Sequence, residues 1–148
     1  MEIATLQKKD WTLLAIAFAD GMPLSPVQLQ KSLFLFGELL PDEVWSEDFY
    51  EFEPYNYGPF CSAVYRDAEA LAEAGLVQII PSAQGYLQYS ATRDGLAQRD
   101  RLCGMLTEDV VGYARQLIEW VRAQSFRGLL SEIYRRYPQY RVNSVFSD

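Results

Sequence analysis

The stretch from Asp20 to Gln28 ends one helix and begins the next, and it constrains the fold more than any other part of the chain. Asp20-Gly21-Met22-Pro23 should end a helix over Trp11 to Ala19, because glycine offers a left-handed cap and proline cannot continue a helix. Ser25-Pro26-Val27-Gln28 then supplies an N-cap hydroxyl, a proline at the first helical position and a glutamine that can reach back to the cap. A second helix is therefore predicted as far as about Leu40.

Later signals alternate between short β-prone runs and helical spacing. In chain order they first predict a strand over Phe49 to Glu53 and a turn over Pro54 to Pro59. A helix from Pro59 or Phe60 to Ala74, capped by Gly75, should come next, followed by a hairpin of Leu76 to Ile80 with Tyr86 to Ser90. The last predicted elements are helices that begin at Thr92, Thr107 and Ser125. This order predicts a mainly α chain of the α+β class. It describes a winged-helix-like core with one short strand, a β-hairpin wing with its tip at Ser82 to Gly85, and carboxy-terminal helices, in a single domain over residues 1–148.

The composition removes most kinds of catalytic site. No histidine is present among the 148 residues, which excludes Ser-His-Asp and Cys-His chemistry and imidazole-based zinc sites. Cys61 and Cys103 form no C-x-x-C motif, so reduced thiols are the simplest interpretation, although a single disulfide stays open. We find no phosphate-binding glycine loop and no metal-ligand spacing, and we therefore predict a non-enzyme without catalytic residues, cofactor or metal.

The charge balance indicates what kind of partner the chain can bind. Thirteen basic and 20 acidic residues give a formal net charge of -7, which opposes phosphate backbones and favours basic protein partners. The longest apolar run, Leu13 to Ala19, is far shorter than the ~20 residues of a membrane-spanning helix, and no signal peptide is visible. The expected location is the cytoplasm, with no membrane contact.

The segment from Pro41 to Glu53 is the most biased of the sequence, with six acids, no base and several aromatics. Period-two geometry in its last part would turn Tyr50 and Phe52 inward and Glu51 and Glu53 outward. The two glutamates could bind a divalent cation or form an acid and base pair, but a solvated face is the commoner outcome. A third interpretation is a partner-binding surface with aromatic anchors in an acidic rim, formed by Trp45, Phe49, Tyr50, Glu51 and Glu53.

Two further blocks resemble a known family. Leu29-Gln30-Lys31-Ser32-Leu33-Phe34-Leu35-Phe36 is similar to the "LQKLLYxA" helix, and Phe52-Glu53-Pro54-Tyr55-Asn56-Tyr57-Gly58-Pro59, followed by Val64-Tyr65, is similar to the "FEAWxYGPVxxxLY" block, of Panacea (SocA-like) domains. The resemblance covers Leu24 to Gly75 and implies an antitoxin or antitoxin-like protein. Where that family carries a Thr-His element followed by Pro-Trp, this chain has Ile133 to Ser144 without histidine.

The Tyr-Gly-Pro step of the second block has a structural and a functional interpretation. In the structural one, Gly58 takes a backbone that few residues adopt, Pro59 presets a helix start, and Tyr57 and Tyr65 are mostly buried. In the functional one, Tyr55 and Tyr57 flank a concave patch that receives a partner side chain or peptide. Both remain open from the sequence.

The carboxy-terminal region differs in charge from the rest of the chain. Residues 121–148 hold five arginines against Glu132 and Asp148, a net charge of +3. Arg135, Arg136 and Arg141 could contact nucleic acid, or could pair with the acidic segment of the same chain or of a second copy in a homodimer. A winged-helix DNA-binding regulator is thus the alternative to an antitoxin that neutralises a toxin. The third predicted helix, which would be the recognition helix, argues against a DNA-binding function, because it holds three carboxylates and a single arginine, Arg66.

Overall fold

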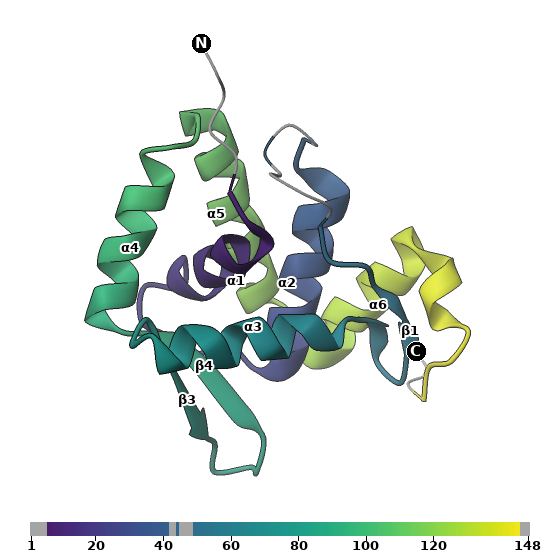
Figure 1. The fold of residues 1–148 in the computed structure, drawn as a ribbon. Coiled ribbons are helices and arrows are strands. Elements are labelled where there is room, and N and C mark those ends of the chain that lie inside the picture. Colours follow the sequence, from purple (N-terminus) through teal and green to yellow (C-terminus); the bar gives the residue numbers. More distant parts are fainter. Residues whose placement is uncertain (1–5, 42–43, 45–48, 146–148) are drawn as a thin grey trace.

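The computed structural model of the chain describes residues 6–41, 44 and 49–145 (Figure 1). In chain order the elements are α1 (Lys8–Ala17), α2 (Pro26–Leu39), β1 (Glu53–Tyr55), β2 (Gly58–Phe60), α3 (Ser62–Glu73), β3 (Val77–Pro81), β4 (Leu87–Ala91), α4 (Arg93–Cys103), α5 (Glu108–Ala123), α6 (Phe126–Arg136) and the 3-10 helix η2 (Pro138–Arg141). The described chain is mainly helical with two small antiparallel hairpins, β1–β2 and β3–β4. The predicted α+β class is confirmed.

The α1 helix lies in the middle of the molecule, and α2, α3, α4 and α5 all contact it (Figure 1). Every residue from Trp11 to Ala17 is buried, as expected for a helix that is apolar on all sides. The Trp11 ring meets the ring of Phe36 in α2 edge to face, with 5.5 Å between centroids. The core is therefore built around α1, and α2 joins it to the outer elements.

The predicted helix signals act as expected. Ser25 Oγ accepts a hydrogen bond from Gln28 N at 3.1 Å, and Gln28 Oε1 accepts one from Ser25 N at 2.9 Å. This reciprocal pair is the capping box that the sequence predicts. After α1 the backbone turns left-handed at Asp20 and Gly21, and Gly75 after α3 has a φ of +81°. Helix boundaries consequently fall within three residues of their predicted positions.

The β3–β4 hairpin is also confirmed, with Val77 opposite Ala91 and Pro81 opposite Leu87. It is tied to the start of α2 by an antiparallel bridge between Leu24 and Tyr89. Leu24 N donates to Tyr89 O at 2.8 Å, and Tyr89 N donates to Leu24 O at 2.9 Å. Figure 1 shows the hairpin projecting away from the helices below α3.

The predicted strand over Phe49 to Glu53 is wrong, because β1 begins at Glu53 and the predicted turn over Pro54 to Pro59 is itself a hairpin. Pro54 and Pro59 stand opposite each other in its ladder. Opposed residues in an antiparallel pair alternate between bonded and non-bonded, and prolines are accommodated where no N–H is needed. The inward and outward directions hold nevertheless: Tyr50 is buried, Phe52 is half-buried, and Glu51 and Glu53 are exposed.

Among the helices of the described residues, none is both long enough and apolar enough to cross a bilayer. Cys61 and Cys103 are free thiols in this structure.

A candidate partner-binding site at the Tyr-Gly-Pro turn

The hairpin of β1 and β2 carries the Tyr-Gly-Pro step at its tip. Tyr55 pairs with Gly58, so Asn56 and Tyr57 form a two-residue connection. Gly58 has a φ of +89°, a conformation that L side chains rarely adopt. A Cβ atom there would also lie 3.3 Å from the Tyr134 ring and 3.4 Å from Cε of Lys31. The special backbone predicted for Gly58 is confirmed.

Two polar side chains of α2 hold this turn from the inside. Gln30 Nε2 donates to Cys61 O at 2.9 Å, while Gln30 Oε1 accepts from Cys61 N at 2.9 Å. Lys31 Nζ donates to Pro59 O at 2.9 Å. Gln30 is 1% exposed and Lys31 is 2% exposed, and burial lowers the pKa of the Lys31 ammonium to about 7. The two family-like blocks of the sequence are thus joined physically, because the first supplies the side chains that fix the backbone of the second.

The carboxy-terminal residues hold the same turn from behind. Asn143 Nδ2 donates to Pro54 O at 3.3 Å, Ser144 Oγ donates to Asn56 O at 3.2 Å, and Val145 N donates to Asn56 O at 2.9 Å. In Figure 1 the yellow segment after α6 returns to β1. The turn is therefore fixed on two sides by segments that lie far from it in the sequence.

A pocket of about 230 Å³ opens beside the turn, and we call it the turn pocket. Its walls come from the start of α2, from the turn and from the first part of α3. They are formed by Pro26, Val27, Gln30, Lys31, Tyr55, Asn56, Tyr57, Gly58, Phe60 and Tyr65. The Phe60 ring lies 4.9 Å from the Tyr55 ring and 5.8 Å from the Tyr65 ring, centroid to centroid. The concave patch expected near Tyr55 and Tyr57 is present, with aromatic walls and an amine-bearing side chain in its lining.

Three large aromatic side chains remain exposed around this pocket and beside it. Tyr55 is 49% exposed, Tyr57 is 44% exposed and Phe126 is 49% exposed. The Tyr57 and Phe126 rings are 5.4 Å apart in an edge-to-face arrangement. The expected burial of Tyr57 is wrong, because its side chain stands at the hairpin tip, where the neighbouring ring of Phe126 covers only part of it. Tyr65 is half-buried and packs against the core, and burial raises its pKa to about 12.

Among the described residues of the acidic segment, Glu51 and Glu53 are exposed, as a binding surface requires. Tyr50 is 6% exposed, so its assignment as a partner contact is wrong. Its hydroxyl donates to Asp67 and lies 2.8 Å from the Thr12 hydroxyl, and burial raises its pKa. Phe49 is partly buried against the core, with its ring 5.0 Å from the Tyr50 ring. These two aromatics anchor the segment to the protein itself. The predicted anchor Trp45 lies outside the described residues.

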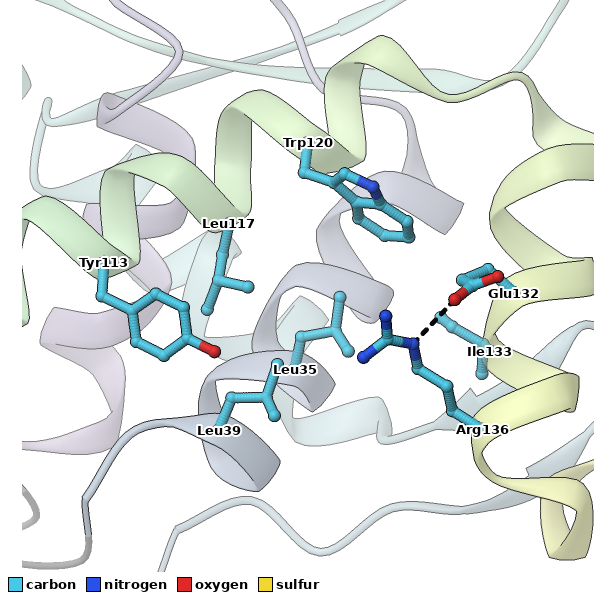
Figure 2. A pocket seen from close by; sticks show the side chains of 8 residues that line it. All are labelled: Leu35, Leu39, Tyr113, Leu117, Trp120, Glu132, Ile133 and Arg136. Carbon is cyan, nitrogen blue, oxygen red and sulfur yellow. Dashed lines mark hydrogen bonds and ion pairs between the residues drawn. The ribbon is translucent and has the colours of Figure 1, made fainter.

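A second hollow, which we call the helical groove, lies between α2, α5 and α6 (Figure 2). Its volume is about 210 Å³, and it is lined by Leu35, Leu39, Tyr113, Leu117, Trp120, Glu132, Ile133 and Arg136. Figure 2 shows the Arg136 guanidinium extending across the apolar floor toward Trp120 while it pairs with Glu132. Sequence reasoning missed this groove, although the helical spacing of apolar residues in α5 was visible.

The carboxy-terminal arginines contact their own neighbourhood. Arg135 and Arg136 both pair with Glu132, at 2.5 Å and 2.7 Å, and these bonds lower the pKa of the Glu132 carboxyl to about 2. The Arg141 guanidinium lies 5.2 Å from the centre of the Tyr134 ring. The carboxylate that Arg135 and Arg136 meet belongs to α6, so their predicted pairing with the acidic segment stays a prediction.

Comparison with known protein families finds no family model that matches this chain, and comparison with curated proteins finds no match. The Panacea-like resemblance therefore stays a prediction from the two motif blocks. Among the residues that the structure describes, no three His, Cys, Asp or Glu side chains gather where they could hold a metal ion. The arrangement offers a shaped aromatic surface, and this surface is the candidate site.

Proposed function

We propose that this chain is a non-catalytic protein-interaction module of the antitoxin type, a single cytoplasmic domain that binds and neutralises a cognate toxin protein. The observation that carries the proposal is the group of exposed rings of Tyr55, Tyr57 and Phe126 around the turn pocket and beside it. Large aromatics next to a pocket are the side chains that most often dominate binding energy at protein interfaces. We call this group the aromatic surface.

The rigidity of the turn supports the same function. Gln30 and Lys31 bind its backbone from below, and residues 143–145 bind it from behind. A surface whose backbone is already fixed loses little conformational entropy when a partner binds. The aromatic surface thus resembles a preorganised docking site more than a loop that orders on contact.

The charges beside the aromatic surface favour a basic partner. Glu51 and Glu53 are exposed, and the whole chain has a net charge of -7. Such carboxylates act mainly on the rate of association, and salt screens their effect. We therefore expect faster capture of a basic protein at low ionic strength.

The alternative function, a winged-helix DNA-binding regulator, is favoured by one observation. The Leu24–Tyr89 bridge ties the β3–β4 hairpin to the chain before α2, and α1, α2, α3 and this hairpin then follow the order of a winged helix, with the wing tip at Ser82 to Gly85. The first turn of α3 would have to reach the bases in such a protein. Here Tyr65 of that turn packs against Phe60 of β2, which supports protein binding over reading of DNA.

A growth-rescue assay tests the proposal. Products of neighbouring genes are expressed alone and with the wild-type chain, and we expect one of them to arrest growth and the chain to restore it. Tyr57→Ala or Phe126→Ala should weaken binding to that product by about 2 kcal/mol, roughly thirtyfold. Tyr86→Ala is the matched control, because Tyr86 is 41% exposed but lies on the β3–β4 hairpin.

Circular dichroism of each variant ensures that only folded proteins are compared. If no neighbouring product arrests growth, the antitoxin assignment is wrong. If Tyr57→Ala and Phe126→Ala rescue as well as the wild type, the aromatic surface is not the interface.

A further inference from the structure

The Lys31 side chain is the most unusual charged group of the described chain. It is 2% exposed, and its amine donates one described hydrogen bond, to the neutral Pro59 carbonyl. Lys31 forms no salt bridge with any other described residue. An ammonium carries three donors, and a buried cation without a counter-charge is costly. The site therefore has unused capacity for an anion.

The Lys31 side chain is part of the lining of the turn pocket. Lys31 and Gly58 both line the pocket, and a Cβ atom at Gly58 would lie 3.7 Å from Nζ of Lys31. The absence of a side chain at Gly58 thus keeps the end of the Lys31 side chain and the Tyr134 ring from being crowded. The other walls are largely aromatic, since they include Tyr55, Phe60 and Tyr65.

The size of the pocket limits what can enter. Its volume of about 230 Å³ is below the roughly 300–1,000 Å³ of pockets that hold drug-sized ligands. One amino-acid residue is the appropriate scale. An aromatic wall selects an apolar side chain and the amine selects a carboxylate, and the last residue of a protein chain is where both occur together.

We propose that the turn pocket receives the apolar carboxyl-terminal residue of a partner protein, with its carboxylate paired to the Lys31 ammonium and its side chain against Tyr55, Phe60 and Tyr65. This inference rests on the proposed function in one respect: the partner approaches the aromatic surface beside the pocket. The basic character expected of the partner is compatible with it, because Glu51 and Glu53 lie outside the pocket lining.

Binding of this kind requires a protonated amine. Burial lowers the pKa of Lys31 to about 7, so the protonated fraction falls from about nine-tenths to about one-tenth between pH 6 and pH 8. The other titratable groups on the adjoining elements are the phenols of Tyr55, Tyr57, Tyr65 and Tyr134 and the thiol of Cys61. The Arg141 guanidinium lies over the Tyr134 ring.

The test uses the full chain and two small probes, N-acetyl-leucine and N-acetyl-leucinamide, which differ only in their carboxylate. Binding is followed by NMR through the Gly58 amide and the Phe60 and Tyr65 ring signals. At pH 6 we expect the acid to bind at least about tenfold more tightly than the amide. At pH 8 the acid should bind about tenfold more weakly than at pH 6, with the amide unchanged.

Lys31→Met should abolish the preference for the acid. If this variant does not fold, the comparison of acid and amide in the wild type decides alone. Equal binding of acid and amide, or no shift of the pocket signals, would overturn the proposal and leave Lys31 as a support for Pro59 only. The growth-rescue result with Phe126→Ala stands apart, because Phe126 does not line the turn pocket and this variant leaves both the pocket and Lys31 unchanged.

Discussion

The turn pocket and the helical groove are similar in volume, about 230 Å³ and 210 Å³, but they treat charge in opposite ways. In the groove, Glu132 meets Arg136 at the surface and also pairs with Arg135 outside the groove lining, so its charge is neutralised. In the turn pocket, Lys31 is buried beside a carbonyl without a described carboxylate. The charges at the helical groove are paired, whereas the Lys31 ammonium at the turn pocket has no described carboxylate as a partner.

This difference teaches where polar groups matter for the fold. Surface ion pairs contribute little, since water and salt screen both partners. Water cannot replace a lost partner of a buried polar group, so losing that partner costs the full desolvation free energy of the group left behind. Substitutions near the turn pocket should therefore destabilise the protein far more than substitutions of the paired charges at the groove.

The largest effect is expected for Gln30→Leu. The substitution leaves the partly buried N–H and C=O of Cys61 without the two bonds that Gln30 supplies, and we expect a loss of about 3 kcal/mol in the free energy of unfolding. Gln116→Leu on the exposed side of α5 is the control and should change stability by less than about 0.5 kcal/mol. Urea denaturation measures both. Equal stability of the two variants would contradict the role given to Gln30.

A smaller effect is expected for Gly58→Val, about 1 to 3 kcal/mol through backbone strain at positive φ. Gly112→Ala is the opposite control: an added Cβ meets nothing within 4 Å there, and alanine favours the helix interior. Thermal melting should move in opposite directions for the two variants. An unchanged midpoint for Gly58→Val would remove the structural role of this glycine.

The charge of Lys31 should also make stability depend on pH. Its pKa is lowered from 10.5 to about 7 in the folded chain, so above pH 7 the unfolded state binds more protons, and stability rises with pH until about 10.5. Between pH 7 and pH 8.5 the gain should be roughly 1 to 2 kcal/mol. Denaturation of wild type and Lys31→Met over this range isolates the effect. A pH slope that persists in Lys31→Met would assign it to other groups.

The smallest effect is expected for Glu132→Gln at the groove. Its carboxyl has a pKa lowered to about 2, so whatever stabilisation it gives is present above the ordinary pKa of glutamate and is lost as pH falls toward 2. Because both arginines are well exposed, the loss at neutral pH should be close to the limit of detection. Denaturation at low and high salt checks this. A loss as large as that of Gln30→Leu would erase the contrast between the two hollows.

Local signals in the sequence predict most of the fold. Ser25 with Gln28, and the glycines at 21 and 75, mark helix ends because their effects act within a few residues. The sequence predicts a plain turn for the hairpin at Pro54 to Pro59, because two prolines argue against strands. The opposed register of Pro54 and Pro59 makes them compatible with a hairpin.

The site was less predictable, because its parts come from distant positions. The motif around Tyr55 and Tyr57 is enough to propose them as site residues. No local pattern around Gln30 or Lys31 predicts that these two side chains bind backbone atoms about thirty residues later in the chain. Phe126 was overlooked because it stands at a helix start with no motif around it. The available signal for the first two was their place, together with Ser32, between the apolar residues of the buried stretch Leu29 to Phe36.

The bonds from residues 143–145 to Pro54 and Asn56 have a consequence for the order of events during synthesis. Chains fold from the amino terminus as they leave the ribosome, and the hairpin of β1 and β2 emerges long before Asn143, Ser144 and Val145. On a nascent chain, the β1–β2 hairpin therefore lacks the hydrogen bonds that residues 143–145 donate to it in the complete fold. The turn beneath the aromatic surface therefore gains its full set of hydrogen bonds only after the chain has been translated through position 145.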